Sequence, residues 1–579
     1  MQKIRDVALL ALASMAAFAQ APTVTAVLDA GGYTSNLAPG SVFVVKGSNL
    51  CSTSVSVTGT PYSTAAMGGA AIRLTPAAGG SPLDAYMVYC YNSGGVTQLA
   101  AVIPSSAAPG TYNLTVTANG TAGAAFATTV VARNFQLMTQ PATGSGRALA
   151  QNVVSQTQYD VNGFTTQPVP GQPFQRSPAK ASQVMIAWGT GLGAAAGFDA
   201  TAPPGLDFLA QGLDVKVIVG GMSITPSFAG RSNTWPGLDN IGFTLPANVP
   251  TGCNVPLQVS VAGQMSNLTT ISIASNGSAC SDSQFAPAVL SKLDSGGSIT
   301  AGYFNLTGFN TNLAFQGQNL AVRIEGASGA FAKYTADTIT QLPNVSTTGG
   351  CEVFQTTTTG SAGSGVSNSL TFLDAGAISL NGPNVSSKAL TESRNVYTLN
   401  LGTSMTGSGT PPIPGLNPSP LITSGTYTLN GAGGADVGPF TASVTINQPL
   451  TVTGGLPATV NRSQDLTIAW TGGNSSDAVV IAGTSSILTT GTVQSGTFNT
   501  ATFVCTTTAG RQTFTVPSSI LQQLQPTTGG TSIGVLTVSS TSSPAAGNGL
   551  FTAPLKAGGN TDFALFTAGI GTAATPTYQ

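Results

Sequence analysis

The chain has 579 residues, of which only 6% are charged, and its formal net charge at pH 7 is −1. An average domain carries about 25% charged residues. So low a charge excludes the basic surface by which proteins bind nucleic acids or anionic membranes. Because 41% of the residues are hydrophobic, the chain can still bury packed cores, and its length predicts three to five domains.

The first residues have the pattern of an export signal. Lys3 and Arg5 precede an apolar run over residues 7–18, and Ala17 and Ala19 form a small-x-small cleavage site. The apolar run is shorter than the roughly 20 residues that a membrane helix needs. We therefore expect a signal peptide over residues 1–19 and no membrane span. The mature chain is expected to be secreted or to lie on the extracellular surface.

Short segments of alternating apolar and polar residues fill almost the whole chain, bounded by Gly, Pro, Asn or Ser; residues 41–47, 111–116 and 438–446 are examples. Helical periodicity is nearly absent, and the best candidate is residues 518–524. Strands at roughly ten-residue spacing with turns between them are typical of β-sandwiches. The pattern predicts an all-β fold of tandem immunoglobulin-like β-sandwiches.

An internal repeat divides the N-terminal half. Gly47 and Gly189 end similar strands, and Pro104 and Pro246 precede similar turns; 189 − 47 = 142 and 246 − 104 = 142. One shared offset predicts two copies of one unit. We expect the following division of the mature chain: sandwich 1 at 22–133, sandwich 2 at 134–275, a β-rich module at 285–448 and an immunoglobulin-like β-rich module at 449–579. A Ser/Asn/Asp-rich junction, residues 276–300, separates the two halves.

The cysteines are even in number, which in an exported chain predicts disulfides. They are Cys51, Cys90, Cys253, Cys280, Cys351 and Cys505. Sequential pairing (51 with 90, 253 with 280, 351 with 505) is the simplest of the connectivities that six cysteines allow. If Cys351 and Cys505 pair, they hold the two C-terminal modules together; if both are free, each is a buried, small apolar residue.

Several short motifs resemble a known family. Residues 36–41 (NLAPGS) and 45–50 (VKGSNL) resemble the opening of an IPT/TIG-like immunoglobulin domain, while 188–193 (WGTGLG) and 241–246 (IGFTLP) resemble the Solibacter-type C-terminal domain of exported bacterial proteins. The likeness covers residues 22–275. It implies an immunoglobulin-like fold and an extracellular setting, but no catalytic residues. Here the unit stands at the N-terminus, which departs from the family's usual arrangement.

The chain contains no histidine. This excludes Ser–His and Cys–His nucleophiles and every zinc site that uses histidine. A carboxylate pair of the kind used in glycoside hydrolysis stays possible, although the mature chain has only three glutamates, Glu325, Glu352 and Glu392. We expect a protein that is not an enzyme and has no cofactor.

Metal-binding signals are weak. The chain lacks the alternating acidic residues of a calcium loop. Asp436, in a glycine-rich turn, is the best single candidate for a metal ligand, and Asp374 is a similar one. The alternative for both is that the carboxylate bonds neighbouring backbone amides and shapes its turn.

Aromatic residues are the better guide to binding. Trp188 and Trp470 end apolar strands and are expected in or near a core. Trp235 lies instead in a polar stretch with Arg231 and Asn233, a combination suited to contact with a sugar or a protein. The alternative is that Trp235 folds back over the sandwich edge.

Three tyrosines surround Cys90 and form a lesser candidate for binding. If this segment is a strand, a period of two places Tyr89 and Tyr91 on one face and Tyr86 on the other.

Three functions fit these observations. The first is a non-catalytic structural or adhesive scaffold that contacts an extracellular protein or glycan. The second is an extracellular carbohydrate-binding protein, and the third, which has least support, is a carboxylate-dependent glycoside hydrolase.

Overall fold

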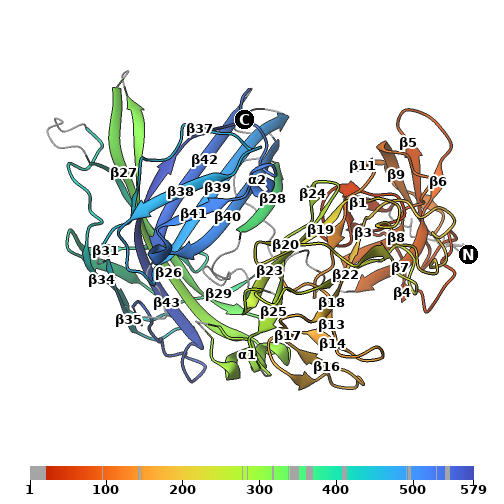
Figure 1. The fold of residues 1–579 in the computed structure, drawn as a ribbon, viewed down its shortest axis with the longest axis horizontal. Coiled ribbons are helices and arrows are strands. Elements are labelled where there is room, and N and C mark those ends of the chain that lie inside the picture. Colours follow the sequence, from red (N-terminus) through yellow and green to blue (C-terminus); the bar gives the residue numbers. More distant parts are fainter. Residues whose placement is uncertain are drawn as a thin grey trace, which may run out of the picture.

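The computed structural model describes residues 21–579, apart from 94–95, 141, 143, 145, 277, 283–284, 316–317, 337, 340–350, 360–369, 407–413, 447, 491, 493–496, 530 and 542–547. The expected signal peptide, residues 1–19, lies outside the described residues. The predicted all-β fold is confirmed. Sandwich 1, sandwich 2 and the C-terminal half follow one another through the molecule (Figure 1).

Sandwich 1 consists of two sheets that face each other across one core. The first sheet has the strand order β1 (Thr23–Asp29), β3 (Val42–Ser48), β8 (Val96–Val102), β7 (Tyr86–Ser93) and β4 (Val55–Ser56). The second has the order β2 (Asn36–Leu37), β11 (Phe126–Val130), β9 (Gly110–Ala118), β5 (Ala70–Pro76) and β6 (Leu83–Asp84). In chain order, the main strands follow the A-B-E-D and C-F-G arrangement of an immunoglobulin domain.

Sandwich 2 repeats this arrangement. Its first sheet contains β15 (Gln167–Pro168), β16 (Gln175–Ser177), β14 (Tyr159–Asn162), β13 (Ala150–Val153), β18 (Val184–Thr190), β22 (Asp239–Thr244) and β21 (Phe228–Arg231), with β12 (Gln136–Leu137) beside β18. Its second sheet contains β17 (Ala179–Lys180), β25 (Thr269–Ala274), β23 (Gly252–Val261), β19 (Val215–Val219) and β20 (Met222–Ile224).

The strands of the two sandwiches recur at the offset that the sequence repeat indicates. Strand β18 begins 142 residues after β3 (184 − 42), and β23 begins 142 residues after β9 (252 − 110). Sandwich 2 differs by the strands β13 to β16, which extend its first sheet. Among these added strands, β16 carries Arg176, which donates a hydrogen bond to the backbone carbonyl of Asp294 in the C-terminal half.

The C-terminal half is built on one ten-stranded sheet. Its strands are β28 (Cys351–Thr359), β40 (Thr497–Thr508), β39 (Ala478–Thr490), β42 (Ser532–Thr541), β43 (Phe563–Ala574), β26 (Ile299–Phe315), β27 (Gln318–Tyr334), β33 (Val396–Met405), β32 (Thr391–Ser393) and β29 (Thr371–Leu373). The boundary expected between residues 448 and 449 falls inside this sheet. Strand β28 precedes that boundary yet pairs with β40, and β43 joins β42 to β26.

Two small sheets cover different parts of the same face. One contains β31 (Val385–Ala389), β30 (Ile378–Gly382), β34 (Gly425–Gly431) and β35 (Phe440–Ile446), and the other contains β36 (Thr451–Val452), β38 (Leu466–Thr471) and β41 (Thr513–Val516). A two-stranded pair, β37 (Thr459–Val460) with β44 (Thr577–Tyr578), lies near the C-terminus. Each small sheet encloses its own core, so the half has two cores under one shared sheet.

The tryptophans expected in cores differ in burial. Trp470 is 1% exposed, and its indole N–H donates a hydrogen bond to the carbonyl oxygen of Ala509 (3.0 Å). Trp188 is half-buried on the outer face of β18, where its indole N–H bonds the side-chain oxygen of Gln151 (3.1 Å). Only Trp470 is therefore a full core residue.

One helix lies where the sequence indicated only a polar junction. Helix α1 (Pro287–Asp294) begins with proline in its first turn, a position at which the missing N–H costs nothing. Its buried Leu290 and Leu293 are three residues apart, too few to reveal periodicity in sequence. The helix expected at residues 518–524 is a single turn, α2 (Ser518–Leu521).

The expected disulfide connectivity is confirmed. Bridges join Cys51 to Cys90, Cys253 to Cys280 and Cys351 to Cys505. Cys351 and Cys505 are opposite each other on β28 and β40. This bridge attaches a strand from before residue 448 to one from after it.

Candidate functional site

The loop that carries Trp235 lies between β21 and β22 and packs against sandwich 1. Gly237 has φ +78°, and a Cβ atom there would lie 2.7 Å from Val42 and 2.8 Å from Val102 of the first sheet of sandwich 1. Trp235, two residues earlier, remains 37% exposed, and Asn233 is also exposed. The loop therefore places a partly exposed indole at the junction of the two sandwiches.

Arg231 does not share this surface. Its side chain is 1% exposed, with Nε 3.3 Å from Oδ1 of Asp239. The remaining nitrogens donate hydrogen bonds to the carbonyl oxygens of Gly40 (2.5 Å) and Gly193 (2.6 Å). The expectation that Arg231 contacts a ligand beside Trp235 is wrong, because the guanidinium is buried and bonds groups of sandwich 1 and sandwich 2.

Burial dominates the electrostatics of this joint. It raises the pKa of Asp239 to about 6, although Arg231 and the backbone N–H groups of Leu192 and Gly191 act in the opposite direction. The N–H of Leu192 lies 2.8 Å from Oδ2 of Asp239. Asp239 is therefore ionised at neutral pH but takes up a proton far more readily than an exposed aspartate.

The outer face of the first sheet of sandwich 1 carries an aromatic surface. Its side chains are Tyr33, Tyr86, Tyr89, Tyr91, Lys46 and Gln98, and we call this set the tyrosine face. Tyr91 is 47% exposed, and the other three tyrosines are half-buried.

A β-bulge in β7 explains why all three tyrosines around Cys90 contribute to it. The register shifts between Met87 and Tyr89, so that Tyr86 pairs with Val102 and Tyr89 with Ala100, two residues on the outer face. The expectation that Tyr86 points to the opposite face is wrong, because one extra residue in the strand breaks the period of two. No sequence pattern marks that bulge.

Tyr33 reaches the face from the turn after β1. Its backbone has φ +57°, a left-handed conformation that is uncommon for a bulky residue. The buried carboxylate of Asp29 holds the turn, because it accepts hydrogen bonds from the backbone N–H groups of Gly31 (2.8 Å), Gly32 (2.6 Å) and Thr34 (2.5 Å). The ammonium of Lys46 lies 4.8 Å from the centre of the Tyr33 ring.

Tyr33 and Tyr89 are electrostatic neighbours. Burial raises the pKa of Tyr33 to about 12, and the proximity of Tyr89 and Asp29 adds to this shift. Burial also raises the pKa of Tyr89, whose hydroxyl accepts a hydrogen bond from the amide of Gln98. Both phenols are therefore neutral hydrogen-bonding groups at physiological pH.

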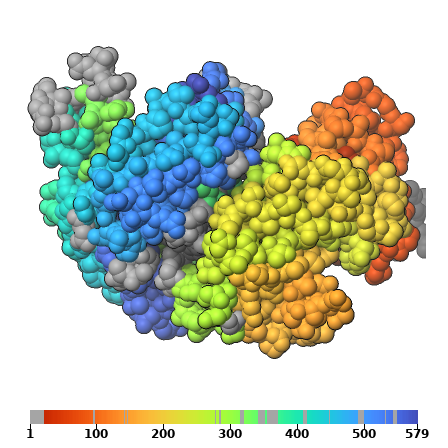
Figure 2. Space-filling model, viewed as in Figure 1, coloured from red at the N-terminus to blue at the C-terminus, as the bar shows by residue number. Residues whose placement is uncertain are grey.

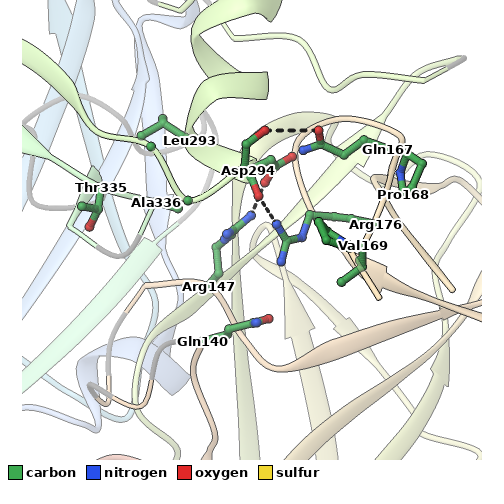
Figure 3. A pocket seen from close by; sticks show the side chains of 14 residues that line it. Gln140, Arg147, Gln167, Pro168, Val169, Arg176, Leu293, Asp294, Thr335 and Ala336 are labelled. Atoms are coloured by element: carbon green, nitrogen blue, oxygen red, sulfur yellow. Dashed lines mark hydrogen bonds and ion pairs between the residues drawn. The ribbon is translucent and has the colours of Figure 1, made fainter. Parts of the chain in front are cut away.

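A cavity of about 530 Å³ lies between sandwich 2 and the C-terminal half (Figure 3). Arg147 and Arg176 of sandwich 2 converge there on Asp294, the last residue of α1. The guanidinium of Arg147 lies 2.5 Å from Oδ1 of Asp294, and the backbone N–H of Thr165 donates to Oδ2 (2.8 Å). Arg176 donates to the backbone carbonyl of Asp294.

The chemistry of this cavity favours a joint over a catalytic site. Asp294 is the one carboxylate among its lining residues, and both of its oxygens are already bonded. Arg147 also stacks over Phe164, 4.7 Å from the ring centre. A pair of carboxylates flanking a substrate, as glycoside hydrolysis requires, is therefore not formed by the residues of this cavity.

Asp436 and Asp374 lie close together, but their carboxylates bond backbone N–H groups of the neighbouring turns. The carboxylate of Asp436 accepts the backbone N–H of Asp374 (2.9 Å), and the carboxylate of Asp374 accepts the backbone N–H of Ala435 (2.9 Å). The N–H groups of Ala435 and Gly376 lower the pKa of Asp374. Within the described part of the chain, no group of three or more His, Cys, Asp or Glu residues could hold a metal ion.

Comparisons with known proteins give no family. No family model and no curated protein matches the chain. The resemblance to the Solibacter-type domain therefore stays a prediction. Across the residues that the structure describes, neither helix is long and apolar enough to cross a membrane.

Solved structures overlap with the chain only loosely. A Bacteroides ovatus protein, SGBP-B of a mixed-linkage glucan utilization locus, solved with a mixed-linkage heptasaccharide, is 12% identical; the overlap covers 52% of this chain and 67% of that one, with TM-score 0.18. A Bacteroides thetaiotaomicron protein of unknown function is 13% identical over 55% and 58% of the two chains (TM-score 0.14). The I67–I69 fragment of titin is 7% identical over 72% and 97% (TM-score 0.11). Such low scores carry no argument about function.

Proposed function

We propose that the protein is an extracellular, non-catalytic scaffold that displays a binding surface at a fixed position. The observation that carries this proposal is that a buried arginine of sandwich 2 reaches across each of its two junctions. Arg231, paired with Asp239 inside sandwich 2, donates a hydrogen bond to the carbonyl oxygen of Gly40 in sandwich 1, and Arg147 pairs with Asp294 of α1. A buried charge cannot lose its partner without a large cost, so these junctions resist bending.

The second junction is also closed by apolar packing. One hydrophobic cluster contains Phe164 and Cys253 of sandwich 2, Leu290 of α1, and Phe563 of β43. The space-filling view shows α1, in green, filling the region where sandwich 2 meets the C-terminal half (Figure 2). Inter-domain surfaces in most proteins permit movement, whereas residues from three parts of this chain share one core.

Three disulfides support an extracellular location, because such bridges persist in oxidising compartments. A secretion assay tests this part of the proposal. The full chain expressed in a bacterial host should be recovered outside the cytoplasm, with a mature N-terminus at Gln20 by mass spectrometry. Recovery of the unprocessed chain in the cytoplasm would contradict it.

Solution scattering tests the rigid arrangement. The wild-type scattering curve should fit the single arrangement in Figure 1, without an ensemble of domain orientations. A curve that requires several orientations would remove the main support for a scaffold.

The carbohydrate-binding alternative is favoured by one observation, a row of half-buried and exposed tyrosines on the outer face of sandwich 1. It is developed below. The hydrolase alternative predicts release of reducing ends from polysaccharides, and a purified protein that releases them would overturn the non-catalytic proposal.

A further inference from the structure

We infer that the tyrosine face of sandwich 1 binds the flat face of a polysaccharide made of neutral pyranose rings. This inference deepens the proposed scaffold function, because it names the surface and the class of ligand. It rests on the placement of the rings, on the polar groups between them and on the adjoining Trp235 loop.

The rings line one side of a sheet. Tyr86, Tyr89 and Tyr91 follow one another along β7, and their partners on β8, Val102 to Gln98, are four residues apart, which spans about 13 Å at the rise of a β-strand. Tyr33 and Tyr89 pack against the same cluster on this side of the sheet. Aromatic rings present an apolar surface with a polar edge, which matches the C–H face and the hydroxyl edge of a pyranose.

Polar groups stand between the rings. Gln98 pairs with Tyr91 across the strands and donates its amide N–H to the hydroxyl of Tyr89. The Gln98 side-chain carbonyl can accept hydrogen bonds from sugar hydroxyls, and the tyrosine hydroxyls can both accept and donate them. Lys46 is the one charged residue of this set, and it is engaged over the ring of Tyr33. With one charge in the set, contacts with a sugar come mainly from ring stacking and hydrogen bonds, which neutral pyranoses can make.

The Trp235 loop extends the surface past one end of the sheet. Gly237 contacts Val42 and Val102, and Val102 is the partner of Tyr86 on β8. Leu238 of this loop packs in the same cluster as Tyr86, so the loop that carries Trp235, 37% exposed, adjoins the Tyr86 end of the face. The hydrogen bond from Arg231 to Gly40 joins the two sandwiches and so fixes the position of the Trp235 loop relative to the tyrosine face.

The experiment is isothermal titration calorimetry on the full mature chain with four probes: cellohexaose, xylohexaose, chitohexaose and a galacturonate hexamer. At least one neutral hexamer should bind, and the galacturonate hexamer should bind more weakly. Tyr91→Ala should weaken the binding about tenfold, which corresponds to about 1.4 kcal/mol. Tyr159→Ala is the matched control, because Tyr159 is 38% exposed on β14 of sandwich 2, outside the tyrosine face.

The possible outcomes separate this inference from the scaffold function. Absence of binding by all neutral hexamers, or equal loss of affinity in Tyr91→Ala and Tyr159→Ala, would overturn the inference. Tighter binding of the galacturonate hexamer would overturn its neutral-sugar part. The scaffold proposal fails separately, through a scattering curve that requires several domain orientations. Near-ultraviolet circular dichroism of each variant shows whether it is folded before affinity is compared.

Discussion

The two halves of the molecule enclose and connect their hydrophobic cores in different ways. In the N-terminal half, each sandwich closes its own two sheets around one core, and the two sandwiches meet through loops and through the buried Arg231, which donates a hydrogen bond to Gly40. In the C-terminal half, two cores lie under a single ten-stranded sheet, and strands cross between them. Separate units joined end to end can be lost one at a time, whereas units that share a sheet must be lost together.

The difference shows what a repeat in sequence can and cannot reveal. The offset of 142 residues was readable because both copies keep equivalent strands at the same spacing. Strand β28 lies far from β40 in sequence, and nothing local in residues 351–359 indicates which edge it joins. The shared sheet depends on such long-range pairing, so alternation alone predicted strands but not their partners.

For the candidate binding surfaces, too, the sequence predicts local features but not those that depend on long-range contacts. The sequence identified Trp235 and the tyrosines near Cys90 as aromatic residues outside the expected cores. It could not show that Arg231 is buried, because the polar stretch around it is typical of a loop. It also could not show the bulge before Tyr89, which depends on pairing with β8. Tyr33 belongs to the surface only through the turn held by Asp29.

The largest expected effect comes from the bridge that crosses the C-terminal half. Replacing Cys351 and Cys505 by serine should lower the free energy of unfolding by about 5 kcal/mol for their sequence separation of 154. Because the sheet is shared, hydrogen exchange should quicken in β26 and β27 as well as in β28 and β40. The measurement is hydrogen exchange by mass spectrometry.

Replacing Cys51 and Cys90 by serine is the matched variant in the other half. The cost should be about 4 kcal/mol for a separation of 39, and it should be confined to sandwich 1. If the Cys351 and Cys505 replacements leave β26 and β27 unchanged, the C-terminal half is not one cooperative unit.

Removing one partner of the buried joint at α1 has the next largest effect. Asp294→Ala leaves Arg147 buried without its counter-charge, which should cost roughly 3–5 kcal/mol. Asp84→Ala breaks the exposed pair with Arg73, whose side chains are 45% and 59% exposed, and should cost roughly 0–1 kcal/mol. Urea unfolding measures the free energy of unfolding of both variants. Equal losses would show that the buried pair at α1 stabilises the protein no more than an exposed pair does.

The joint between the sandwiches should respond to pH. The folded pKa of Asp239, about 6, exceeds its usual value of 3.8. The native state therefore binds the proton more tightly, so this group's stabilisation is complete below pH 4 and is lost as pH rises through 6. Wild type should gain about 2 kcal/mol more than Asp239→Asn between pH 7 and pH 4, since each unit of pKa shift is worth about 1.4 kcal/mol and the unfolded carboxyl is itself partly protonated at pH 4.

Unfolding of both proteins across this pH range provides the measurement. Asp29, whose pKa burial also raises, is present in both and drops out of the difference. A wild-type curve parallel to that of Asp239→Asn would show that this carboxyl does not take up a proton in the folded joint.

The smallest expected effect on stability is at the tyrosine face. Tyr91 is 47% exposed, so Tyr91→Ala should change the free energy of unfolding by no more than about 0.5 kcal/mol. Thermal unfolding of the variant measures this. A loss of several kcal/mol would mean that the ring supports the fold instead of standing available for a ligand.

The rigidity of the whole scaffold is tested most directly by a distance between its ends. Cysteines introduced at Ala78 in sandwich 1 and Ala557 in the C-terminal half, both exposed, can carry spin labels. Pulsed electron–electron double resonance then measures the distribution of distances between the two labels. All native cysteines are paired, so only the new thiols react. The account predicts one narrow distance distribution that broadens in Asp294→Ala; a broad distribution in the otherwise wild-type chain would contradict it.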